Sequence, residues 1–166
     1  MGREAVAILL RVGAAKVHKH WCLFSADVKS AFLKGVGQDS KRVLYFWPPR
    51  NGPPLPGVKP GSLIQILKGV FGLNDAPRKW WLGFFQILLQ TGFVASKCCM
   101  ALFFLWDQQG ILRGIVGLHV DEIVAAGDEY FEAKLEEVNK AVGFVSVKKN
   151  KFDPDEQSTQ GKTNWE

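Results

Sequence analysis

The sequence predicts an α+β fold in which a mostly antiparallel sheet has helices packed on one face. Three observations support this prediction. The chain of 166 residues is 47% apolar, which suits one domain with a buried core. Helical patterns do not alternate strictly with strand patterns, which argues against a parallel sheet built from βαβ units. Two strand-like runs, 101–106 and 111–119, flank a short turn and are expected to pair as an antiparallel hairpin.

The N-terminal part of the chain is expected to form a helix and then a strand. Residues 5–12 place apolar side chains at helical spacing, and Gly13 marks the end of that helix. Residues 21–26 form a short apolar run that is typical of a buried strand, and the run ends in an acid, Asp27. A carboxylate is therefore expected at the end of a buried strand.

The middle of the chain is expected to hold two short strands and a long loop. Residues 43–47 are rich in β-branched and aromatic side chains, and residues 63–67 are the next strand candidate. Residues 48–61 carry most of the prolines in the chain, which excludes a helix or a sheet ladder there. We expect a stiff surface loop, with a polyproline ligand for a partner protein as the alternative.

The strongest helical pattern follows a turn at residues 69–72. Asn74 or Asp75 is expected to cap the helix, and Pro77 falls in its first turn, where a missing N–H has little effect. Apolar side chains then recur at helical spacing: Trp81, Phe84, Phe85 and Leu88. Gly92 is expected to end this helix.

Two adjacent acids, Asp121 and Glu122, interrupt an apolar run at the expected tip of a second hairpin. A buried strand does not tolerate such side chains without a compensating partner. Asp128 is then expected to cap a helix that ends at Gly143, and residues 144–147 are the last expected strand.

Composition and charge exclude several classes of protein. The formal net charge of +5 permits a polyanionic partner. No apolar run reaches the ~20 residues of a membrane span, and the N-terminus lacks a secretory signal pattern. Three cysteines without a Cys-x-x-Cys pair argue against a disulfide framework and a structural zinc site. We expect an intracellular protein, cytoplasmic or nuclear, with no membrane partner.

The acids at the expected strand ends point to a cation. Carboxylates held over an apolar core are unfavourable unless they bind a positive group. Mg²⁺ takes oxygen ligands and keeps several waters, so two or three carboxylates suffice to hold it. Two alternatives remain open at this point. Asp27 is also a candidate cap for a helix over residues 28–33, and Asp121 with Glu122 is also a candidate β-turn.

Three segments together resemble the motifs of copia-type (Ty1/copia) retrotransposon reverse transcriptases. Residues 25–35, Ser-Ala-Asp-Val-Lys-Ser-Ala-Phe-Leu-Lys-Gly, are similar to the family's first catalytic motif. Residues 67–80 end in Gly-Leu-Asn-Asp-Ala-Pro-Arg-Lys-Trp and are similar to its next motif. Residues 119–122, His-Val-Asp-Glu, stand where the family carries Tyr-Val-Asp-Asp. The order of the three segments and the spacing between them agree with those of the family's motifs. The resemblance spans residues 3–147.

The resemblance implies a fold and a reaction. Residues 1–147 would form a right-hand polymerase palm with partial fingers, and 148–166 a polar tail. The reaction would be RNA-directed DNA synthesis by two-metal nucleotidyl transfer to a primer 3′-hydroxyl. Asp27 and Asp121 would hold two Mg²⁺ ions, with Mn²⁺ as the alternative ion, and Glu122 would be the third catalytic acid.

The resemblance also assigns residues to the substrates, a deoxynucleoside triphosphate and a primer–template. The backbone facing the triphosphate would be that of Val28, Lys29, Ser30 and Ala31. Phe32 would be the steric gate against a ribose 2′-hydroxyl, with plain core packing as the alternative. Phe71, Gly72 and Pro77 would lie near the nascent base pair and the template.

Two basic residues, Arg78 and Lys79, would contact nucleic-acid phosphates, with an ordinary solvated helix turn as the alternative. Trp80 and Trp81 are expected to pack within their helix rather than to stack on bases.

Two of the motifs depart from the family pattern. Glu122 is one methylene longer than the family's aspartate, and a displacement of about 1 Å can cost roughly 100-fold in rate. Asn74 and Asp75 replace a Lys-Gln pair, which removes a positive charge beside the template. We also expect the chain to lack the thumb and to depend on other polyprotein domains, an integrase and an RNase H. The alternative function is that of a catalytically inactive remnant that binds nucleic acid weakly or contacts a protein partner.

Overall fold

The computed structural model describes residues 2–37, 43–49, 51–53, 55–59 and 61–151. The chain divides into two compact units. We call residues 1–29 with 87–166 the sheet unit and residues 30–86 the insert unit. Each unit is described by itself.

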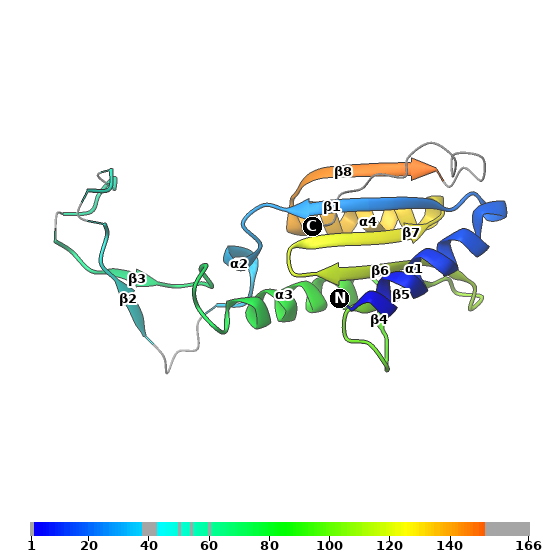
Figure 1. The fold of residues 1–166 in the computed structure, drawn as a ribbon, viewed down its shortest axis with the longest axis horizontal. Coiled ribbons are helices and arrows are strands. Elements are labelled where there is room, and N and C mark those ends of the chain that lie inside the picture. Colours follow the sequence, from blue (N-terminus) through cyan, green and yellow to red (C-terminus); the bar gives the residue numbers. More distant parts are fainter. Residues whose placement is uncertain (1, 38–42, 50, 54, 60, 152–166) are drawn as a thin grey trace. The chain divides into compact units, whose positions relative to one another are not determined.

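The sheet unit contains six strands in the order β4-β5-β6-β7-β1-β8, and every neighbouring pair is antiparallel (Figure 1). The strands are β1 (Cys22–Val28), β4 (Phe93–Ala95), β5 (Leu102–Trp106), β6 (Leu112–His119), β7 (Glu122–Gly127) and β8 (Phe144–Lys151). The predicted α+β class with an antiparallel sheet is confirmed, and so is the hairpin of β5 and β6.

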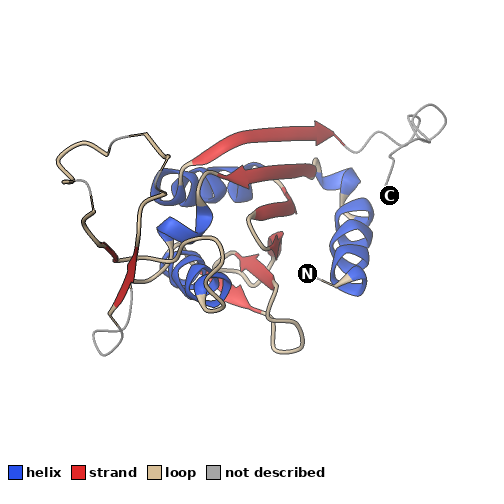
Figure 2. Ribbon diagram, turned by 60° about the vertical axis from the view of Figure 1, so that its left-hand side comes forward, coloured by secondary structure: helices blue, strands red, loops and turns tan. Residues whose placement is uncertain are grey.

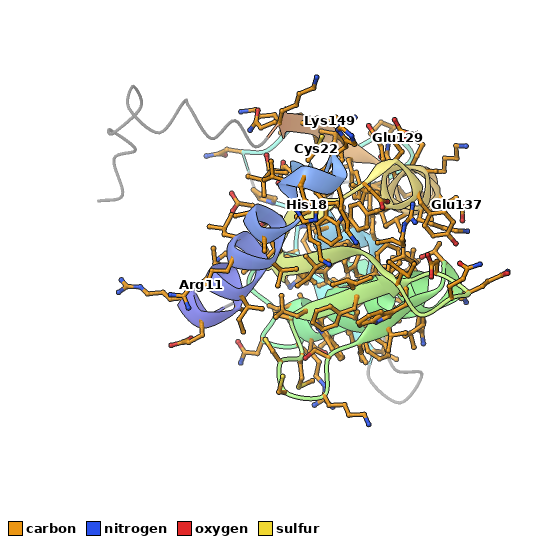
Figure 3. The ribbon with its side chains drawn as sticks, turned by 90° about the vertical axis from the view of Figure 1, so that its right-hand side faces the viewer. Arg11, His18, Cys22, Glu129, Glu137 and Lys149 are labelled. Carbon is orange, nitrogen blue, oxygen red and sulfur yellow. The ribbon has the colours of Figure 1, made fainter. Side chains whose placement is uncertain are left out.

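Two helices cover this sheet from opposite sides, α1 (Arg3–Ala15) and α4 (Glu129–Val142). Figure 1 shows α1 in front of the sheet and α4 behind it, and Figure 2 shows the strands between them. In Figure 3, Arg11 on α1 and Glu137 on α4 lie on opposite sides of the strands. The expectation that helices pack on one face is therefore wrong for this unit.

The physical reason lies in the central strands. Residues 114–118 of β6 are buried in succession, as are residues 125–127 of β7. Because successive side chains of a strand point to opposite faces, such strands need cover on both sides. The continuous apolar run was visible in the sequence, and it is the signal of a strand buried on both faces.

Helix α1 covers one face through two buried residues, Ala5 and Leu9, which belong to a core cluster with residues of the sheet: Trp21, Leu102, Ile115 and Ala126. A half-buried residue of β1, Leu23, packs against the same cluster. The helix predicted over residues 5–12 is thus confirmed and is longer at both ends.

Helix α4 covers the other face through Phe131. The aromatic ring of Phe131 lies against Gly114 and Gly127, where an added Cβ would collide with it. Its ring centroid is 5.8 Å from that of Phe24 on β1. The carboxylate of Asp128 accepts a hydrogen bond from the N–H of Phe131 (3.1 Å), which confirms the predicted cap.

Strand β8 is longer than predicted, because it pairs with β1 as far as Lys151 opposite Cys22. Residues 148–151, expected at the start of a polar tail, therefore belong to the edge strand of the sheet. Charged side chains are common on such edges because they discourage pairing with other chains. The rest of the expected tail lies outside the described residues.

The insert unit contains a short helix, a two-stranded ribbon and most of a long helix. These are α2 (Ala31–Lys34), the antiparallel pair of β2 (Leu44–Phe46) and β3 (Ile64–Ile66), and α3 (Ala76–Gln90), whose last residues belong to the sheet unit. Both predicted strands are confirmed, each slightly shorter than expected. Part of the proline-rich segment, including Pro54 and Pro60, lies outside the described residues.

Helix α3 begins directly after Asp75, whose backbone carbonyl accepts the N–H of Lys79 (3.0 Å). Asp75, rather than Asn74, therefore occupies the capping position. Trp80 is buried against Phe84 with ring centroids 5.4 Å apart, and Trp81 stacks on Phe85 at 4.9 Å. Packing of both tryptophans within the helix is confirmed. None of the helices among the described residues has the length and hydropathy of a membrane span.

Candidate active site

The hairpin of β6 and β7 turns through two residues, Val120 and Asp121. His119 ends β6 and pairs with Glu122, the first residue of β7. Val120 has a φ of 53°, in the left-handed region that β-branched residues rarely adopt. Strain of this kind persists only where the surrounding structure imposes it, and it concentrates at functional sites. The β-turn alternative is correct for Asp121, whereas Glu122 belongs to a strand.

The end of β1 lies beside this turn. Asp27 is paired with Glu122 on β7, and the N–H of Val28 donates to the backbone carbonyl of Asp121 (3.1 Å). Residues 27, 121 and 122 are therefore brought together at one end of the sheet. Asp27 lies within β1, while helix α2 begins only at Ala31, so the alternative of Asp27 as a helix cap is wrong.

Four side chains form one row across the strands, which we call the carboxylate row: His119, Glu122, Asp27 and Ser146. Directly paired residues on antiparallel strands share a face. Asp27 lies four residues after Leu23, which packs against the α1 cluster, so the row belongs to the α1 side of the sheet. All four residues are exposed, so the row is open to a ligand.

The side chains of the three acids are unpaired within the part of the chain that the structure describes. Asp27, Asp121 and Glu122 make no side-chain hydrogen bond or ion pair with any described residue. Like charges directly opposite each other, as at Asp27 and Glu122, destabilise a strand pair. An arrangement of this kind favours a bound cation.

The donor set suits a hard cation such as Mg²⁺. Within the described parts of the chain, no three carboxylate, imidazole or thiol groups are placed to hold a metal ion by themselves. Mg²⁺ is commonly held by one or two carboxylates, waters and substrate phosphates rather than by a complete protein cage. The end of the sheet offers two to three side chains with oxygen ligands, which fits this way of binding Mg²⁺.

One N–H group of the backbone that is expected to face the triphosphate already donates a hydrogen bond within the protein. The N–H of Val28 is used by Asp121, so it is not free for a phosphate in this arrangement. Lys29 is exposed and has no side-chain partner among the described residues. Ser30 has a left-handed φ of 54° and precedes α2, whose first residue, Ala31, is buried.

In the insert unit, Phe32 and Phe71 are neighbours. Their ring centroids are 4.7 Å apart in an edge-on arrangement. Phe32 is buried, whereas Phe71 is 78% exposed and is followed by Gly72 with a φ of 92°. Phe32 therefore packs in the core, as the alternative expectation stated, and its role as a gate stays a prediction.

The two basic residues at the start of α3 differ in their surroundings. The ammonium of Lys79 lies 3.0 Å from the carboxylate of Asp75. Arg78 and Pro77 are exposed, and Arg78 has no ion pair with a described residue. Arg78 is thus the better candidate for a phosphate contact, because Asp75 compensates the charge of Lys79.

Sequence analysis missed the contribution of β8 to this face. Ser146 was not singled out, and residues 148–151 were expected in a tail. The sequence alternates between apolar and polar residues only from Val145 to Lys148, and residues 148–151 are all polar, so no strand period marks the end of β8.

Comparison with known proteins assigns the family. The model of the family described as "Reverse transcriptase (RNA-dependent DNA polymerase)" matches residues 3–151. The chain is 30% identical over 130 residues to the retrovirus-related Pol polyprotein from transposon RE2 of Arabidopsis thaliana. The corresponding polyprotein from transposon RE1 of the same plant gives the same identity and length of match. The matched segment is 76% of this chain and 8% of each polyprotein.

No solved structure matches this chain. The family match covers nearly all described residues, including the three acids at the end of the sheet. The expected resemblance to copia-type retrotransposon enzymes is confirmed by the two plant polyproteins. The chain therefore belongs to the reverse transcriptase (RNA-dependent DNA polymerase) family.

Proposed function

We propose that the sheet unit is the palm of a template-directed DNA polymerase and that the carboxylate row lies in its active site. The observation that carries this proposal is the pairing of Asp27 with Glu122 beside Asp121. Three acids from segments about 90 residues apart in the chain lie at one end of the sheet, and their side chains have no hydrogen bond or ion pair with a described residue. The substrates would be a deoxynucleoside triphosphate and a primer annealed to RNA or DNA.

In the proposed reaction the primer 3′-oxygen forms a bond to the α-phosphorus of the nucleotide. The bond from that phosphorus to pyrophosphate breaks, and the proton of the 3′-hydroxyl is released to solvent. Asp27 and Asp121 would hold two Mg²⁺ ions, with Glu122 beside them. When bound, such ions stabilise the attacking and the leaving oxygens of the displacement.

The test is primer extension by this chain on RNA and DNA templates, with Mg²⁺ or Mn²⁺. Asp27→Asn and Asp121→Asn are each expected to lower the rate by at least about 100-fold, because each removes a charge that stabilises the reacting phosphate. Glu137→Gln serves as the control, since Glu137 lies on α4, on the side of the sheet opposite α1, and forms a surface ion pair with Lys134 (Figure 3). Retention of full activity in both aspartate variants would exclude the proposal.

A second candidate function is nucleic-acid binding without catalysis. One observation favours it, the longer acid Glu122 at the position where the family carries an aspartate. Primer–template binding that weakens with salt and survives both aspartate substitutions, without extension in the wild type, would support this second function. An integrase and an RNase H from the same polyprotein remain the proposed partners of the catalytic form.

A further inference from the structure

A lysine on the edge strand shares the face of the carboxylate row. The pairing of β8 with β1 sets Ser146 opposite Asp27 and Lys148 opposite Ser25. Residues two apart on a strand point to the same side. Lys148 therefore follows Ser146 on the α1 side of the sheet, one row away from the acids.

The next residue, Lys149, points to the other side. Its ammonium lies 2.6 Å from the carboxylate of Glu132 on α4 and 5.8 Å from the ring centre of Phe24. Hydrogen bonding to Glu132 raises the pKa of Lys149. The contacts of Lys149 with α4 confirm the face assignment of Lys148, because neighbouring residues of a strand alternate.

Lys148 has no such partner. It is exposed and makes no ion pair or hydrogen bond through its side chain with any described residue. As a diagonal neighbour of Asp27 across the strands, its Cα lies roughly 7–8 Å from that of Asp27. Ser25, the residue paired with Lys148, is small and half-buried, so it does not separate the lysine from the acids.

We propose that Lys148 binds a phosphate group of the substrate beside the carboxylate row, an inference that rests on the proposed function. Because Lys148 forms no ion pair with the acids, its charge is available to an anion that reaches the acids through bound Mg²⁺. The phosphate belongs either to the primer strand or to the incoming nucleotide, and both present the same anionic oxygens.

The adjacent lysines provide a matched pair of variants. Lys148→Gln and Lys149→Gln each remove one positive charge from the same edge strand, so their effects on the overall field of the protein are alike. They differ in the face from which the charge is removed. Circular dichroism verifies that both variants fold, and Lys148→Gln removes no side-chain hydrogen bond or ion pair with a described residue.

The first arm measures binding of a dideoxy-terminated DNA primer on an RNA template, by fluorescence anisotropy between 50 and 200 mM salt. If the phosphate is that of the primer, Lys148→Gln weakens binding roughly two- to fivefold, the range of an exposed ion pair. The slope of log Kd against log salt then falls by about one. When uncharged methylphosphonate linkages replace the phosphates at the primer end, Lys148→Gln and the wild type are expected to bind the primer–template with equal affinity.

The second arm measures binding of a fluorescent deoxynucleoside triphosphate to the same complex, with Mg²⁺ present. If the phosphate is that of the nucleotide, Lys148→Gln weakens this binding by a similar factor and leaves the primer–template affinity at the level of Lys149→Gln. Because the terminated primer lacks a 3′-hydroxyl, neither arm depends on turnover.

Equal behaviour of Lys148→Gln and Lys149→Gln in both arms would overturn the inference. This failure is distinct from that of the proposed function, which would appear as absent primer extension in the wild type. An effect of Lys148→Gln on binding without any extension would retain the phosphate contact and leave only catalysis excluded.

Discussion

At the scale of single residues, the candidate site is defined by charges without partners. Asp27 and Glu122 face each other across β1 and β7, and no described side chain compensates them. Arg113, in contrast, lies 2.7 Å from Asp128, and Lys149 lies 2.6 Å from Glu132. Ion pairs thus form elsewhere in the sheet unit, whereas Asp27 and Glu122 make none with a described residue.

The first prediction concerns the repulsion between Asp27 and Glu122. Without divalent ions, Glu122→Gln is expected to raise the free energy of unfolding by roughly 0.2–1 kcal/mol, the usual size of a cross-strand charge effect. Urea unfolding at low salt measures the change, with Glu137→Gln as control. A loss of stability in Glu122→Gln would contradict the absence of a compensating partner for this acid.

The second prediction concerns the ion pair between Lys149 and Glu132. Hydrogen bonding to Glu132 raises the pKa of Lys149 above its ordinary value of 10.5. A raised pKa in the folded state stabilises the protein fully below the ordinary value, and this contribution is lost as pH rises through the folded-state pKa. Lys149→Gln is therefore expected to flatten the alkaline decline of the unfolding midpoint, measured from pH 9 to about 12.

A matching decline in Lys149→Gln and the wild type would show that other groups govern the alkaline loss. Lys148→Gln is the control, because Lys148 has no ion pair with a described residue and should leave the decline unchanged.

At the scale of elements, Phe131 fixes α4 on the sheet. Gly114 and Gly127, on neighbouring strands, leave room for its ring, and no larger residue fits at either position. The cap by Asp128 sets where the helix begins, and Gly143 ends it with a φ of 72°. This packing supports the strands β6 and β7, whose hairpin carries Asp121 and Glu122.

The third prediction follows from that packing. Gly114→Ala is expected to destabilise the protein by about 1–3 kcal/mol, because the added methyl group overpacks the core against Phe131. Combination with Phe131→Leu should be less destabilising than the sum of the two single changes, since a smaller side chain makes room. Strict additivity in urea unfolding would show that Gly114 and Phe131 do not interact.

At the scale of the whole molecule, the chain consists of two units, and the residues singled out in the sequence are divided between them. The sheet unit holds the acids and Lys148, and the insert unit holds Phe32, Phe71 and Arg78. The chain spans 8% of the length of the two plant polyproteins, which come from transposons. Its net charge of +5 is modest, so the proposed binding of nucleic acid would depend on phosphate contacts at particular lysines and arginines.

Local patterns in the sequence were sufficient for much of this description. Apolar spacing predicted α1, α3 and α4, and the capping residue Asp128 was identified from its position before an amphipathic run. The motifs containing Asp27 and Asp121 indicated the family, which the comparisons confirm. These features depend on residues close together in the chain, so they can be read without knowledge of the fold.

Only the tertiary structure decided which side chains share a face. Pairing between distant strands places Glu122 opposite Asp27. Helices α1 and α4 pack on opposite faces of the sheet, and Lys148 and Lys149 point to opposite faces. The reason is that side chains alternate along a strand, so a shift of one residue in register exchanges the two faces. The register between two strands is set by contacts between segments far apart in the sequence. A local pattern of residues does not specify these contacts.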